Sequence, residues 1–111
     1  AKGRACARVL RWGVQSDLVP DETFDIILGA DVVASIYDPT ALAHTFYSLS
    51  GPHTKIYVSY KERLTEPHKV FETEMRRLFG DFVRVRPKSR NRNEGVWILE
   101  IGGKNCDVGV V

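Results

Sequence analysis

The stretch "FDIILGADVVASIYDP", residues 24–39, decides the fold class. Its first half contains three consecutive aliphatic residues, Ile26 to Leu28, without alternation, which is typical of a strand covered on both faces in a parallel sheet. Asp38 and Pro39 predict the start of a helix, because an aspartate can accept from free backbone N–H groups and proline suits the first helical position. The stretch therefore predicts a buried strand followed closely by a helix.

The rest of the chain continues this alternation. We expect strands at 7–12, 24–33, 55–61, 82–86 and 95–101 and helices at 39–49 and 66–79, with Thr65 capping the second helix. Strands that alternate with helices favour an open, mostly parallel sheet with helices packed on it. The last two strands, joined by a polar loop, predict an antiparallel hairpin, and residues 102–111 predict a loose, Gly-rich tail.

The bulk properties indicate one domain in a reducing compartment. The 111 residues carry a formal net charge of +2 and only two cysteines, Cys6 and Cys106, too few for a disulfide framework. The expected location is the cytoplasm, with the nucleus as the alternative, and no membrane association is expected because no apolar run is long enough. The three histidines have no metal-like spacing, so we expect surface positions and no metal site. The absence of an initiator Met indicates a fragment or a processed form.

The motifs resemble those of a known family. "LRWG" at residues 10–13 and "LGAD" at residues 28–31 are similar to the C-terminal part of the class I, seven-β-strand S-adenosylmethionine-dependent methyltransferases, and within them to methyltransferase family 16, the lysine methyltransferase-like branch. The resemblance implies a single, partial domain over residues 1–111. It would be the C-terminal half of a Rossmann-like sheet, mostly parallel with one antiparallel C-terminal hairpin.

The same resemblance implies site residues. Trp12 and Ala30 would line the adenine pocket, and Gly29, which has no side chain, would let the cofactor approach the backbone. Asp31 would be the substrate-facing catalytic acid. Gly29, Ala30 and Asp31 lie at the carboxyl end of the expected strand at 24–33, where ligands bind in such sheets. Trp12 could equally be an ordinary half-buried aromatic residue, and Asp31 a cap of the strand end. Ala34 stands where the family has an aromatic residue, and Tyr37 is the nearest substitute.

The implied function is S-adenosylmethionine-dependent methylation of a lysine on a protein substrate. The family's glycine-rich turn and its ribose-binding acid have no counterpart in these residues, so the cofactor site would have only one wall. Methyl transfer depends on positioning and desolvation, which half a site does not supply. We therefore expect the 111-residue chain alone to be inactive.

A basic stretch supports an alternative function. "RVRPKSRNR", Arg84 to Arg92, places five basic residues in nine positions. The first interpretation is a solvated hairpin loop, and the second is a patch that docks an acidic protein. No aromatic residue interleaves the charges, so nucleic acid is the less expected ligand. The alternative is thus a non-catalytic α/β module that binds an acidic protein or nucleic acid through this loop.

Overall fold

The computed structural model describes residues 3–30, 32–33, 38–61, 66–85 and 96–108. Asp31, Ala34, Tyr37, Thr65 and the loop at 86–95 lie outside the described residues. The elements are a short 3-10 helix at Gln15–Asp17, β1 at Phe24–Ala30, α1 at Pro39–Ser48, β2 at Ser50–Lys61, α2 at Glu66–Leu78, β3 at Phe79–Val85 and β4 at Val96–Lys104. From Phe24 onward, the predicted alternation of strands and helices is confirmed.

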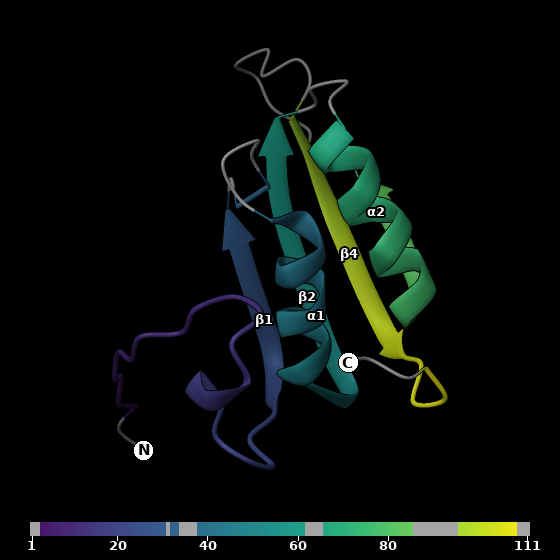
Figure 1. Ribbon diagram of the computed structural model, residues 1–111. Coiled ribbons are helices and arrows are strands. Elements are labelled where there is room, and N and C mark those ends of the chain that lie inside the picture. Colours follow the sequence, from purple (N-terminus) through teal and green to yellow (C-terminus); the bar gives the residue numbers. More distant parts are fainter. Residues whose placement is uncertain (1–2, 31, 34–37, 62–65, 86–95, 109–111) are drawn as a thin grey trace.

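The four strands form one sheet in the order β1-β2-β4-β3 (Figure 1). β1 is parallel to β2, whereas β4 is antiparallel to both of its neighbours, β2 and β3. β4 is therefore the one reversed strand among the four, and the predicted antiparallel pairing of the last two strands is confirmed. This mixed α/β arrangement fits the fold that the sequence resemblance implies.

The first helix begins where the sequence predicts. The Asp38 carboxylate accepts hydrogen bonds from the N–H groups of Thr40 and Ala41 at 3.0 and 3.2 Å, and Pro39 opens the helix. The helix ends at Ser48, one residue before the expected end at 49, and Gly51 and Pro52 belong to β2. They lie in an irregular start of the strand, where the pairing with β1 shifts register, which is a place that tolerates proline.

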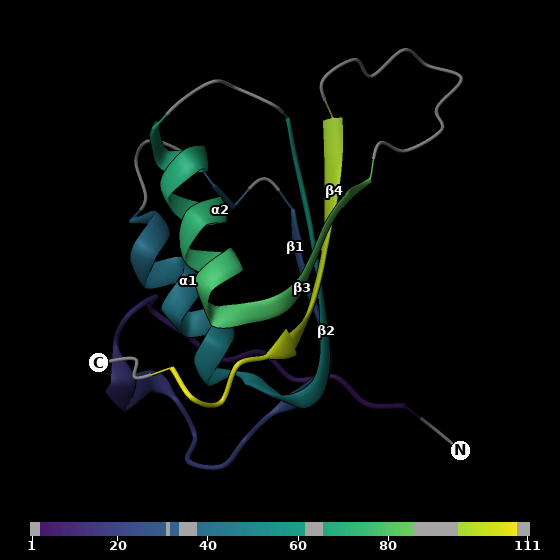
Figure 2. The ribbon, with the colours of Figure 1, turned by 90° about the vertical axis from the view of Figure 1, so that its right-hand side faces the viewer.

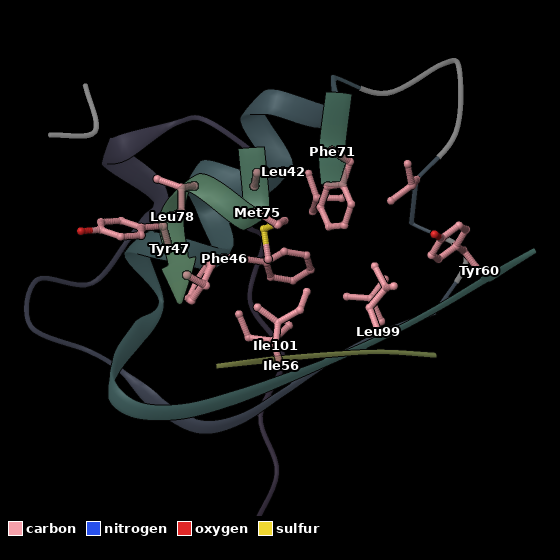
Figure 3. Close-up of a cluster of buried hydrophobic side chains, with 14 residues drawn as sticks. Leu42, Phe46, Tyr47, Ile56, Tyr60, Phe71, Met75, Leu78, Leu99 and Ile101 are labelled. Atoms are coloured by element: carbon pink, nitrogen blue, oxygen red, sulfur yellow. The ribbon is translucent and has the colours of Figure 1, made fainter. Parts of the chain in front are cut away.

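Both helices pack on the same face of the sheet (Figure 2). The core lies between the two layers, and the rings of Phe46 and Phe71 meet there edge to face with their centroids 6.1 Å apart (Figure 3). The second helix was expected at 66–79, but it ends at Leu78, and Phe79 starts β3. Val70 on this helix is exposed. The largest fully buried side chains come from α2, β2, β3 and β4: Phe71, Met75, Leu78, Ile56, Val58, Phe79, Leu99 and Ile101.

The prediction that the first strand is covered on both faces is wrong for β1. Ile26 is 60% exposed and Leu28 is 76% exposed, because both point away from the helices. Ile27 and Gly29 point the other way and are half-buried. No described element covers the open face of the sheet at β1 (Figure 2). The consecutive aliphatic residues would be fully buried only with a second layer, which the described residues do not supply.

The predicted strand at 7–12 is also wrong. Residues 7–11 have no regular structure and Trp12 lies in a turn, because no described strand offers hydrogen bonds to this segment. It is held instead by ion pairs from Arg8 to Glu22 and from Arg11 to Asp17. The hydrogen bond from the Arg11 side chain lowers the pKa of Asp17 to about 2.

The chain after β4 is more ordered than the loose tail that was expected. Residues 102–104 belong to β4, and the N–H of Asn105 donates to the Leu78 carbonyl at 2.9 Å. The Tyr47 hydroxyl donates to the carbonyl oxygen of Asn105 at 2.7 Å, and the Lys104 ammonium lies 4.3 Å from the centroid of the Tyr47 ring. The chain up to Val108 is thereby fixed against α1, while residues 109–111 lie outside the described part.

Two histidines differ from the expected surface positions. His68 is buried, with its ring centroid 4.9 Å from that of Tyr60. His44 on α1 is half-buried, and its Nε2 lies 2.8 Å from Glu74 Oε2 on α2. The helices therefore meet through a polar pair as well as through the core.

Neither helix has the length and hydropathy to cross a membrane.

The contacts of Glu74 with Arg77 and His44 should make the protein less stable as the pH falls. The hydrogen bond from Arg77, supported by His44, lowers the pKa of Glu74 against the opposing effect of burial. A carboxyl group whose pKa is lower in the folded state stabilises the protein above its unfolded pKa, and that stability is lost as the pH falls through the folded value. We expect Glu74→Gln to flatten the decline in the thermal midpoint below about pH 5, measured by circular dichroism. A decline as steep as in the unsubstituted chain would contradict this role of Glu74.

Candidate functional site

The candidate site lies where the parallel strands β1 and β2 end. Gly29 and Ala30 close β1, and Ala30 is paired with Ser59 of β2. A Cβ atom at Gly29 would lie 3.3 Å from Val32 Cγ2 and 3.5 Å from the Phe46 ring, so this position faces the helix layer. Ala30 is exposed on the opposite face. Any larger residue at 29 would push against the core, which explains the glycine at this strand end.

An open hollow of about 310 Å³ lies on the sheet face beside Ala30. Its wall is mainly apolar, and the hydroxyl-bearing side chains of Tyr57 and Ser59 come from β2. The lining consists of Leu28, Gly29, Ala30, Tyr57, Ser59 and Ile98. The hollow is therefore a shallow surface that a flat ligand could cover from one side.

A larger cleft, of about 580 Å³, lies at the other end of the sheet. It runs between the segment before β1 and the residues around the end of β4, and Tyr47, Lys104 and Glu22 line it. Lys104 already donates to the Ser50 carbonyl, and Glu22 already pairs with Arg8. None of the candidate residues from the sequence lines this cleft. We therefore place the candidate site at the smaller hollow, on chemistry rather than on size.

Trp12 lies apart from that hollow. The turn that holds it packs against α1, since the N–H of Gly13 donates to Thr45 Oγ1 at 2.9 Å. Gly13 has a φ of 80° and a Cβ there would lie 3.1 Å from Ala41 Cβ, so the glycine is required. Trp12 itself is partly buried against the core cluster. Gly29 and Ala30 line the hollow and Trp12 does not, and Asp31 lies outside the described residues.

Sequence reasoning missed a polar cluster near the same edge. The Tyr60 hydroxyl donates to Glu72 Oε2 at 2.9 Å and accepts from Arg84 at 3.2 Å. The Arg84 guanidinium also pairs with Glu72 at 3.1 Å and lies 5.0 Å from the centroid of the Trp97 ring. Burial raises the pKa of the buried Tyr60 hydroxyl. We call these four residues the Tyr60 cluster.

The Tyr60 cluster joins α2, β2, β3 and β4, so no local sequence pattern could reveal it. Tyr60 and Trp97 face each other across the β2–β4 pairing, which is known only once the strand register is known. The sequence assigned Arg84 to the basic loop, but its ion pair with Glu72 places it within the fold. The part of the chain that the structure describes contains no group of His, Cys, Asp and Glu that could hold a metal ion.

Comparison with known proteins decides the family. The sequence model of a family described as lysine methyltransferase matches residues 1–78, which include Gly13, Ala30 and all of α2. The chain belongs to the lysine methyltransferase family. The resemblance carried by "LRWG" and "LGAD" is thereby confirmed.

Two relatives of this lysine methyltransferase family member support the assignment. The chain is 32% identical over 96 residues to EEF1A lysine methyltransferase 3 of Mus musculus, which covers 85% of this chain and 39% of the relative. It is 37% identical over 71 residues to protein N-lysine methyltransferase METTL21A of Danio rerio, which covers 64% of this chain and 32% of the relative. The chain thus spans less than half the length of the curated relatives it matches.

Proposed function

We propose that this chain forms the C-terminal half of an S-adenosylmethionine-dependent protein-lysine N-methyltransferase. The family match over residues 1–78 carries the proposal. Both relatives are named as lysine methyltransferases, and one name specifies EEF1A. We extend to this chain the general substrate, a lysine side chain on a protein, and name no particular protein.

The lining of the hollow fits one wall of a cofactor site. A backbone that ends in Gly29-Ala30 leaves space at the rim, and the apolar surface of Leu28 and Ile98 suits the flat face of an adenine. Among the described residues, neither an acidic side chain for the ribose nor a glycine-rich turn lines this hollow. The remaining walls would come from residues that have no counterpart in this chain.

When bound, S-adenosylmethionine supplies an electrophilic methyl group for a lysine amine. The part of this chain is to position the two reactants. Gly29 and Ala30 would seat the adenine, and Trp12 would stack on it, a contact worth about 1–3 kcal/mol. Trp12 lies beside α1 in this chain, so stacking requires further strands that hold its segment in the sheet. Asp31 would hold the incoming ammonium by charge attraction and orient the lysine for transfer.

We expect the isolated chain to bind S-adenosylmethionine weakly. A one-walled hollow leaves most of the ligand in water, whereas small-molecule sites bury most of their ligand. Isothermal titration calorimetry with the 111-residue chain should therefore give no binding in the micromolar range. A micromolar Kd, or methyl transfer by the chain alone, would show that the site is already complete.

The proposed activity is tested with a longer version that adds the residues encoded upstream in the same gene. With radiolabelled methyl on the cofactor and a protein extract as substrate, label should appear on lysine. Ala30→Leu should reduce the initial rate at least about tenfold by filling the rim, and Asp31→Asn should also slow transfer. Thr73→Ala, an exposed change on α2, is the matched control. A longer version without a glycine-rich turn and without any transfer would refute the proposal.

The alternative, a basic module for acidic proteins or nucleic acid, has no observation in its favour. Its loop lies outside the described residues apart from Arg84, which Glu72 already pairs. Both relatives are named as enzymes. We therefore do not carry it forward.

A further inference from the structure

The Tyr60 cluster lies directly behind the wall of the candidate site. Tyr60 is the second-last residue of β2, and Trp97 faces it across the β2–β4 pairing. Their chain neighbours Ser59 and Ile98 also pair with each other, and both line the hollow. Adjacent residues of a strand point to opposite faces of the sheet. The cluster therefore contacts, from the helix side, the two strand segments whose other side forms the hollow.

Both the ring and the hydroxyl of Tyr60 have defined partners. The ring packs on His68 with the centroids 4.9 Å apart. The hydroxyl donates to Glu72 and accepts from Arg84, and the Arg84 guanidinium contacts the two carboxylate oxygens of Glu72 at 3.1 and 3.2 Å. Such two-point contacts fix direction as well as distance. Because Tyr60 is only 3% exposed, little water competes for these bonds, and α2 and β3 together determine where the end of β2 lies.

Stability alone does not require a polar network at this place. Burial of charged and hydroxyl groups costs solvation free energy, and apolar side chains of similar volume often stabilise a fold at least as well. Directed bonds differ from apolar contacts in that they allow few alternative arrangements. A ligand site benefits from this restriction, because its wall must stay in one position when the ligand binds.

We propose that Tyr60 is a positioning residue for cofactor binding, whose hydroxyl fixes the carboxyl end of β2. Ser59 of this strand end pairs with Ala30, so the bonds of Tyr60 keep both residues in place as one wall of the adenine site. Tyr60 points to the helix side, away from the hollow, and acts through the strand rather than by contact with the cofactor. The inference rests on the proposed function, which makes the hollow a cofactor wall.

Positioning and support of the fold have different kinetic effects. A loosened wall weakens cofactor binding equally in the ground state and the transition state, which raises KM and leaves kcat nearly unchanged. A partial loss of folded protein instead lowers the apparent kcat and leaves KM unchanged, because the molecules that remain folded have an intact site. The two parameters therefore separate the two roles.

Steady-state kinetics of the longer version, with a fixed amount of protein extract and varied S-adenosylmethionine, test the role. Tyr60→Phe keeps the ring and its contact with His68 and removes only the hydroxyl. We expect the KM for S-adenosylmethionine to rise about five- to tenfold, with kcat changed less than about twofold. An unchanged KM in the folded variant would overturn the proposal.

Tyr47→Phe is the matched control. It also removes a buried tyrosine hydroxyl, one that donates to the Asn105 carbonyl at 2.7 Å, and Figure 3 shows Tyr47 and Tyr60 at opposite ends of the buried cluster. The KM of Tyr47→Phe should equal that of the unsubstituted protein. An equal rise in both variants would point to a general weakening of the core and would contradict a specific role of Tyr60.

A second variant removes the other partner of the same bond. Glu72→Ala, checked for folding by far-UV circular dichroism, should also raise the KM, and the double variant with Tyr60→Phe should raise it no further than the larger single effect. Fully additive effects would contradict a shared path through this bond. If the unsubstituted longer version transfers no methyl group, the proposed function fails and this role fails with it. If it is active and neither single variant changes the KM, only the role of Tyr60 is refuted.

Discussion

Replacing Phe71 with alanine should lower the free energy of unfolding by about 3–5 kcal/mol. Phe71 is 1% exposed and lies on α2, where its ring meets Phe46 of α1 edge to face. The substitution removes the burial of a large aromatic side chain and leaves a cavity between the two layers. Because small domains have only about 5–15 kcal/mol in total, this loss is a large fraction of the stability. Urea unfolding followed by far-UV circular dichroism measures the change.

Val70→Ala is the control for Phe71→Ala. Val70 precedes Phe71 on the same helix but is 38% exposed, so it fills no enclosed space. The two substitutions change helix propensity in a similar direction, and only Phe71→Ala empties the core. Similar shifts in the urea midpoint for both variants would show that the core does not depend on the Phe46–Phe71 contact.

Replacing Glu72 with alanine should destabilise the chain by about 1–3 kcal/mol. Glu72 accepts from the buried Tyr60 hydroxyl and pairs with Arg84, so its carboxylate connects three elements of the fold. Without it, the Tyr60 hydroxyl loses its acceptor at a site that water reaches poorly. Tryptophan fluorescence during urea unfolding measures the loss and also reports on Trp97.

The control for Glu72→Ala lies at the start of the same helix. Glu66 is an exposed acid whose pair with Lys69 spans 3.6 Å. Exposed pairs of this kind contribute little, so Glu66→Ala should leave the urea midpoint almost unchanged. A loss at Glu72 no larger than the loss at Glu66 would show that the Tyr60 cluster adds nothing to stability.

Local sequence signals predicted the elements that local interactions form. The Asp38 cap and Pro39 located α1, and the helix expected at 66–79 matches α2 to within one residue. The two last strands were found because β-branched residues flank a polar loop. Where the prediction failed, the deciding partner was distant in sequence. Residues 7–12 have strand-like composition, but no described strand lies beside them.

The candidate site shows the same difference between residues placed by local sequence and residues placed by distant contacts. Gly29 and Ala30 were proposed because small residues at a strand end form a recognisable motif, and both line the hollow on this strand. The Tyr60 cluster was missed because Glu72 and Arg84 meet only after α2 packs on the sheet. Trp12 belongs to the other recognised motif, but it packs against the core cluster and does not line the hollow.

The central position of β4 has a consequence for how the chain is made. β3 pairs with no other described strand, and β4 lies between it and β2. During synthesis on the ribosome, β3 must therefore wait unpaired until translation has passed Lys104 and the final strand has slid between its two neighbours. A truncated product that lacks β4 would have no strand between β2 and β3, so β3 would lose its pairing partner.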